Sequence, residues 1–127
     1  MRKKCTALRN KTYKQDSKDS VYCLYIIECS NDHFYIGYTD NMARRYAAHC
    51  SGSPSCKYTR SFPPKRLAAF WQFETDKGEV LRLEYQLKQL NHQQKQDLTK
   101  SPSELQQYTA LDFIVGTVDE GWGDGAG

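Results

Sequence analysis

The sequence contains no apolar run of about 20 residues, the length that a membrane-spanning helix needs. No apolar stretch follows the first methionine, so we expect no secretory signal. The five cysteines are odd in number and form no Cys-x-x-Cys pair. Disulfide frameworks use paired cysteines in oxidising compartments, so none is expected here. These absences predict a reduced, cytoplasmic protein that does not associate with membranes.

What is present suits one globular domain, because the chain has 127 residues, 39% of them hydrophobic and 26% charged. We expect a flexible basic arm at 1–19, a folded zone at 20–100, and a C-terminal extension at 101–127. The extension has a Gly-rich, acidic end that we expect to be disordered. A basic arm attracts phosphate backbones, but a solvated tail without function explains the same composition equally well.

Within the folded zone, β-branched and aromatic residues predict strands at 21–27, 34–38 and 67–73. A first helix is expected from a cap at Asp40 or Asn41, and a second runs from Asp76 to about Leu90. A loop is expected at 57–64, and a last short helix at 93–99. The order ββαβα(α) predicts an α/β (α+β) fold in which helices pack on a small sheet. Between Ser103 and Val118, a further short helix or strand is expected.

Two charged residues on the first helix share a face, since Arg45 and His49 are four residues apart. The guanidinium offers a fork of donors that matches phosphate oxygens, so this pair could clamp a phosphate. A solvated helix surface is the alternative, and the pair alone does not decide between them.

The second helix places an acid at the margin of its apolar stripe. Glu84 lies beside the stripe made by Leu83 and Leu87, where a carboxylate needs a partner. That partner is either Lys88, one helical turn on, or a divalent cation. The residues alone leave both open.

Two strand tyrosines, Tyr22 and Tyr35, have the pattern of half-buried packing residues. Gly37 leaves a gap in the sheet surface where a ligand could approach. Basic and aromatic residues around the expected loop could contact a nucleic-acid backbone, or form an ordinary charged loop. They are Lys57, Tyr58, Arg60, Lys65 and Arg66. A zinc site is a weak alternative, built from Cys29, His33, Cys50 and Cys56, whose spacing fits no common pattern.

Four segments in order resemble the GIY-YIG nuclease superfamily, most closely its small stand-alone bacterial YhbQ-like members. More distantly, the chain is similar to the catalytic subunit of an endonuclease that cuts branched DNA. The segments are Ser20-Val21-Tyr22, Tyr35-Ile36-Gly37, the helix with Arg45 and His49, and the helix with Glu84. Ser20 and Val21 depart from the Gly and Ile of the family name. The resemblance spans about 20–99 and implies a three-stranded antiparallel sheet flanked by helices.

The resemblance also implies a function, metal-dependent hydrolysis of phosphodiester bonds in DNA, with a place in DNA repair or recombination. Glu84 would hold one Mg²⁺ or Mn²⁺ ion, and Arg45 would stabilise the transition state. Tyr22 and Tyr35 would place the attacking water, and His49 could assist proton transfer. Which of these three residues takes the proton is left open. The residues expected to contact DNA are Arg44, Lys57, Tyr58, Arg60, Lys65, Lys88 and Lys95. A targeting protein is a further expected partner, and the rival functions are a weakly cutting DNA-binding module and a protein-binding adaptor.

Overall fold

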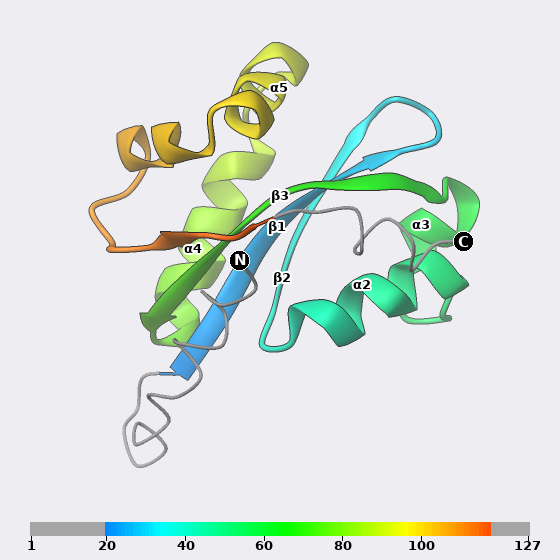
Figure 1. Cartoon of the computed structure of the whole chain (residues 1–127), viewed down its shortest axis with the longest axis horizontal. Coiled ribbons are helices and arrows are strands. Elements are labelled where there is room, and N and C mark those ends of the chain that lie inside the picture. Colours follow the sequence, from blue (N-terminus) through cyan, green and yellow to red (C-terminus); the bar gives the residue numbers. More distant parts are fainter. Residues whose placement is uncertain (1–19, 118–127) are drawn as a thin grey trace.

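The computed structural model describes residues 20–117, so the expected arm at 1–19 and the end at 118–127 lie outside the described residues. A central sheet has α4 and α5 on one side and α2 and α3 on the other (Figure 1). The elements are β1 (Ser20–Cys29), β2 (Phe34–Thr39), α2 (Met42–Ser51), α3 (Lys57–Ser61), β3 (Pro64–Thr75), α4 (Lys77–Lys88), α5 (His92–Lys100), the 3-10 helix η2 (Pro102–Gln107) and β4 (Ile114–Val115).

The sheet is antiparallel, with strand order β2-β1-β3-β4. The expected α+β architecture is confirmed, but residues 20–117 contain four strands where three were expected. The additional strand, β4, pairs with the edge of β3 through Trp71↔Val115 and Gln72↔Ile114. An uncovered edge strand presents unpaired backbone groups, and the extension after the last helix supplies partners for them.

The helices begin and end where their capping residues predict. The side chain of Asn41 accepts from the backbone N–H of Arg44 and starts α2. Gly52 ends that helix in the left-handed conformation with φ 73°. Asp76 starts α4 in the same way as Asn41, by accepting from the backbone N–H of Glu79. None of the helices between residues 20 and 117 combines the length and apolarity that a bilayer crossing requires.

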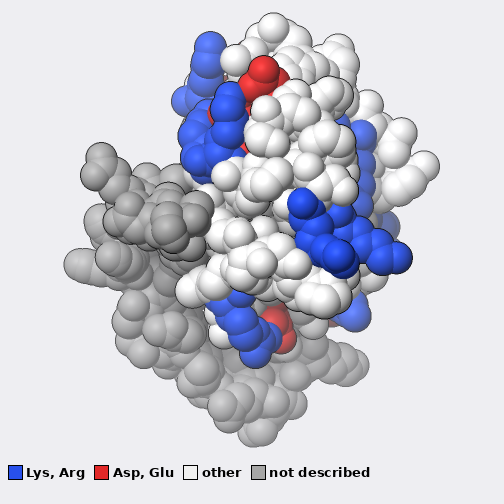
Figure 2. All heavy atoms as spheres, turned by 90° about the vertical axis from the view of Figure 1, so that its right-hand side faces the viewer, with Lys and Arg blue, Asp and Glu red and all other residues white. Residues whose placement is uncertain are grey.

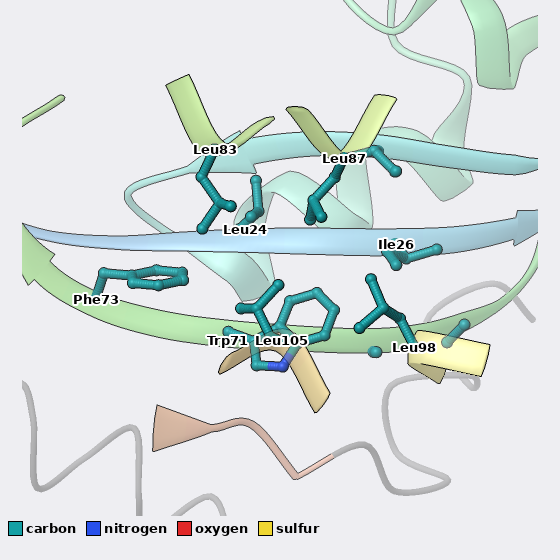
Figure 3. Packing of buried hydrophobic residues seen from close by; sticks show 11 residues of the cluster. Leu24, Ile26, Trp71, Phe73, Leu83, Leu87, Leu98 and Leu105 are labelled. Carbon is teal, nitrogen blue, oxygen red and sulfur yellow. The ribbon is translucent and has the colours of Figure 1, made fainter. Parts of the chain in front are cut away.

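Apolar packing on both faces of the sheet fixes how the helices sit. On one face, Leu83 and Leu87 of α4 pack with residues of all three long strands and with α5 and η2 (Figure 3). The ring nitrogen of Trp71 also donates to the backbone oxygen of Pro102 at 2.9 Å, which ties η2 to the sheet. On the other face, Met42 and Tyr46 of α2 pack against β1 and β3. The buried side chains of β1 therefore point alternately to the two helix layers.

The segment after α2 differs from the expectation of a loop, because Lys57–Ser61 form the short helix α3. A helix of five residues has little stability of its own. Its side chains are held by tertiary contacts: Tyr58 stacks on Tyr35, and Thr59 is buried against His49. These contacts are not visible in local sequence pattern.

Candidate active site

Tyr25 of β1 lies opposite Gly37 of β2 in the antiparallel register, and the ring of Tyr25 fills the space over the glycine. A Cβ atom at Gly37 would lie 2.6 Å from the Tyr25 hydroxyl oxygen, closer than any real Cβ contact. The gap that Gly37 was expected to offer a ligand is therefore occupied by a side chain of the protein itself. The glycine positions Tyr25 between β2 and the helix layer formed by α2 and α3.

A buried hydrogen-bond chain begins at this phenol. The Tyr25 hydroxyl lies 2.8 Å from Nε2 of His49, and Nδ1 of His49 lies 2.7 Å from the hydroxyl of Thr59. The Thr59 hydroxyl donates to the backbone oxygen of Cys56 at 3.3 Å, so it accepts from His49. The proton of neutral His49 is thus on Nδ1, and Nε2 accepts the hydrogen of Tyr25.

Arg45 closes the arrangement, because its guanidinium hydrogen-bonds the Tyr25 side chain and also donates to the Ser55 hydroxyl at 3.3 Å. Burial raises the pKa of Tyr25, and the hydrogen bond from Arg45 offsets part of that rise. Burial and then the charge of Arg45 lower the pKa of His49 to about 4, so this imidazole is neutral near pH 7. The expectation that Arg45 and His49 share a face is confirmed, and Tyr25 is the group they share.

Tyr35 of β2 lies over the same cluster and is the more exposed phenol. Its ring is edge-on to His49 with 5.2 Å between centroids and stacks on Tyr58 at 5.6 Å. Burial raises the pKa of Tyr35, the charge of Arg45 lowers it, and the charge of Glu84 raises it. The Tyr35 hydroxyl therefore lies within electrostatic reach of both the guanidinium and the carboxylate.

Glu84 of α4 lies at the margin of the buried stripe, with 15% of its side chain exposed. It forms an ion pair with Lys88 at 3.5 Å, the first of the two partners left open by the sequence. Between residues 20 and 117, no cluster of three or more His, Cys, Asp or Glu could hold a metal ion. The zinc alternative at the cysteines therefore finds no support there. One carboxylate fits a Mg²⁺ ion that keeps waters and takes its other oxygens from a substrate phosphate.

Tyr22 does not join this cluster, which corrects the expectation that Tyr22 and Tyr35 flank one cavity. Paired residues of antiparallel strands share a face, and Tyr35 pairs with Ile27. Tyr22 lies two residues before Leu24 on the same strand, so it shares the α4 face with Leu24. Tyr22 instead packs edge-on against Tyr38 at 6.4 Å. Tyr25, three residues on, has the parity that brings it beside Tyr35. The missed signal was this parity, which becomes decisive only when the register of the hairpin is known.

Several residues expected to contact DNA have acidic neighbours. Lys65 pairs with Asp32 at 2.6 Å and with Glu28 at 3.8 Å, and Arg66 pairs with Glu28 at 2.8 Å. These bonds reduce the positive charge that the start of β3 offers to a phosphate.

Arg44 also has an acidic neighbour, since it pairs with Asp40 at 3.6 Å. Lys57 and Arg60 project from α3 beside Tyr58, and within the described residues neither has a carboxylate partner. Lys and Arg gather in separate clusters on this side of the molecule, where few acidic atoms show (Figure 2). Lys95 lies on α5, on the other side of the sheet from α2.

Known proteins resemble this chain over most of the described residues. The profile of the GIY-YIG catalytic domain matches residues 21–97. A UPF0213 protein of Cupriavidus necator is 44% identical over 79 residues, which cover 62% of this chain and 84% of that protein. A UPF0213 protein of Halobacterium salinarum is 43% identical over 75 residues, covering 59% of this chain and 95% of that one.

Among solved structures, the solution NMR structure of a UPF0213 protein from Bacillus halodurans is 36% identical, with a TM-score of 0.41. The match covers 72% of this chain and 99% of that one. The domain profile spans more than half of the sequence, and the resemblance first noted in short motifs extends through both helix layers. The chain belongs to the GIY-YIG catalytic-domain family.

Proposed function

We propose that this protein is a metal-dependent endonuclease that hydrolyses phosphodiester bonds in DNA, with the structure-selective action of a repair or recombination enzyme. One observation carries the proposal. The Tyr35 ring packs edge-on against His49 beside the buried Tyr25–His49 hydrogen bond, and the charges of Arg45 and Glu84 act on its hydroxyl in opposite directions. A cation, a carboxylate and a phenol that influence one another are what a phosphate, a metal ion and an attacking water require.

Tyr35 is proposed to place the attacking water and to take its proton, since Tyr25 and His49 are both only 1% exposed. A free phenol has a pKa of about 10, so a basic role requires its anion to be stabilised. Burial raises the pKa of Tyr35, and the charge of Arg45 offsets part of that rise. A bound metal ion would supply the remaining stabilisation of the anion. This assignment replaces Tyr22 as a catalytic candidate and gives His49 no direct proton transfer with the substrate.

Tyr25 and His49 are proposed as positioning residues. The phenol oxygen accepts from Arg45, while its hydrogen is held by His49 and the imidazole is held by Thr59. The guanidinium is therefore oriented before substrate arrives, and it stabilises the additional charge of the pentavalent transition state.

Glu84 is proposed to hold the metal ion, and the expected ligand set is this carboxylate, water and phosphate oxygens. When bound, the ion would stabilise charge on the phosphate and the leaving oxygen and would offset the charge of Glu84 near Tyr35. Lys88 is then free to exchange its ion pair with Glu84 for a nearby DNA phosphate.

The test is to incubate the protein with end-labelled duplex, single-stranded and branched DNA in Mg²⁺, in Mn²⁺ and in chelator. If the protein is a nuclease, we expect cuts that depend on the metal and vanish in chelator. Retarded DNA without cuts would indicate a binding module instead, and neither cuts nor retardation would indicate the adaptor. Comparison of the three DNA shapes would report structure selectivity directly.

A further inference from the structure

A hollow of about 500 Å³ opens where the end of β2 meets the first turns of α2 and the start of α4. This volume lies within the range of about 300–1,000 Å³ that is usual for small-ligand sites. The groups that give the hollow its chemistry are two phenols, three cations and one carboxylate: Tyr22, Tyr38, Arg44, Arg45, Lys77 and Asp40. The composition suits an anionic ligand that also has a flat or apolar part.

The charge in the hollow is only partly balanced. Asp40 is the one carboxylate among the lining residues, and it pairs with Arg44 at 3.6 Å. No acidic group between residues 20 and 117 pairs with Lys77. The Lys77 ammonium instead lies 5.9 Å from the centre of the Tyr38 ring. A cation held over an aromatic ring remains able to bind a phosphate.

The aromatic wall is preformed. Tyr22 and Tyr38 come from neighbouring strands and meet at 61° with their ring centres 6.4 Å apart. Both side chains are partly exposed, so they present ring surface to the hollow. Sites for single-stranded nucleic acid combine these elements, with cations along the backbone and aromatic rings against sugars or bases.

The hollow adjoins the candidate active site through Arg45. The guanidinium bonds Tyr25 and Ser55 in the active-site cluster, and the same side chain lines the hollow. We propose that the hollow is a nucleotide subsite for the unit next to the scissile phosphate, an inference that rests on DNA being the substrate. Lys77 binds the phosphate of that nucleotide, and Tyr22 and Tyr38 pack against its sugar or base.

The test measures binding of a fluorescein-labelled single-stranded oligonucleotide in chelator, where no cutting occurs, across a range of salt concentrations. Lys77→Gln removes one phosphate contact, so the slope of log K against log salt should become shallower by about 0.7. Tyr38→Leu should weaken binding about tenfold by removing one stacking surface. Lys100→Gln, which removes an exposed lysine at the end of α5, is the matched control and should change neither quantity.

The inference is overturned if Lys77→Gln shows the same salt slope as Lys100→Gln. A folded Tyr38→Leu variant that binds as tightly as the original would also overturn it, with circular dichroism as the check on folding. A cleavage assay separates the subsite from the nuclease activity. If the protein binds in chelator with the predicted variant effects but never cuts in Mg²⁺ or Mn²⁺, the subsite is supported and the proposed nuclease activity is overturned. If the protein cuts DNA but Lys77→Gln binds like the control, the nuclease activity is supported and the subsite is overturned.

Discussion

The Tyr25 hydroxyl donates its hydrogen to Nε2 of His49 across 2.8 Å, and both of these residues are only 1% exposed. Thr59 determines the direction of this bond, because its hydroxyl accepts from Nδ1 of His49 and so leaves Nε2 as an acceptor. The phenol oxygen also accepts a hydrogen bond from Arg45, which lowers the pKa of Tyr25 against the effect of burial. A bond between two buried residues therefore positions the phenol that contacts a partly exposed guanidinium.

Tyrosine-to-phenylalanine changes should distinguish, by their cleavage rates, Tyr35 from a tyrosine outside the site. Tyr35→Phe removes the hydroxyl proposed to place the water, so cleavage should fall by roughly 10²–10⁴-fold. Tyr108→Phe, the matched control, removes a hydroxyl beside η2 on the other face of the sheet and should leave the cleavage rate within about threefold. Rates measured under single-turnover conditions check both. Equal losses in the two variants would contradict the assignment of Tyr35.

Gly37→Ala should destabilise the protein, because the new Cβ would lie 2.6 Å from the Tyr25 hydroxyl oxygen in a packed region. We expect a loss of about 1–3 kcal/mol in the free energy of unfolding, measured in urea, together with reduced cleavage as Tyr25 shifts. Gly78→Ala is the control, since its Cβ would meet Asp76 at an ordinary 3.5 Å. Gly78 lies within α4, so that change should be neutral or stabilising by up to about 1 kcal/mol. A Gly37→Ala variant as stable as Gly78→Ala would show that Tyr25 does not depend on the glycine.

His49 should make stability depend on pH below neutrality. Its pKa is lowered from 6.5 to about 4 in the folded state, so above about pH 6.5 the imidazole is neutral in both states and its full contribution is present. As the pH falls from 6.5 towards 4, the unfolded chain binds a proton that the folded protein resists, and stability decreases. One pKa unit corresponds to about 1.4 kcal/mol, so the total loss is ~3 kcal/mol.

Urea unfolding between pH 7 and pH 4 measures this decrease. His49→Gln should flatten the profile over that interval, because the titrating group is gone. His33→Gln removes an exposed imidazole and should retain the decrease. An unchanged profile in His49→Gln would assign the pH dependence to other groups.

Glu84→Gln should abolish metal-dependent cleavage, with a loss of about 10²-fold or more, because the proposed metal site has a single carboxylate. DNA binding in chelator should survive, since the change removes a negative charge from the surface that faces DNA. Glu79→Gln on the same helix breaks only the exposed pair with Arg82 and should leave cleavage unchanged. Loss of activity in both variants would point to damage of α4 rather than to a metal ligand.

Local chemistry was sufficient to predict most of the elements. Asn41 and Asp76 start their helices by accepting from the backbone N–H group three residues on, an interaction that depends only on near neighbours. The margin position of Glu84 follows from helical periodicity alone. By contrast, α3 was missed, since it is held by contacts with Tyr35 and His49. The short helix or strand expected between Ser103 and Val118 is present as η2 and β4, but the pairing of β4 with the edge of β3 was not predicted.

The order of the amino acids was enough to assign the helix faces, because Arg45 and His49 four residues apart must lie together on any α-helix. It also determined that Tyr22 and Tyr25 point to opposite faces of their strand, since side chains alternate. Which of these tyrosines lies beside Tyr35 depends instead on the pairing of the strands in the folded protein. The pairing of Tyr25 with Gly37 depends on the turn between the strands and on which helix covers which face, and a register slip of one residue would exchange the two tyrosines.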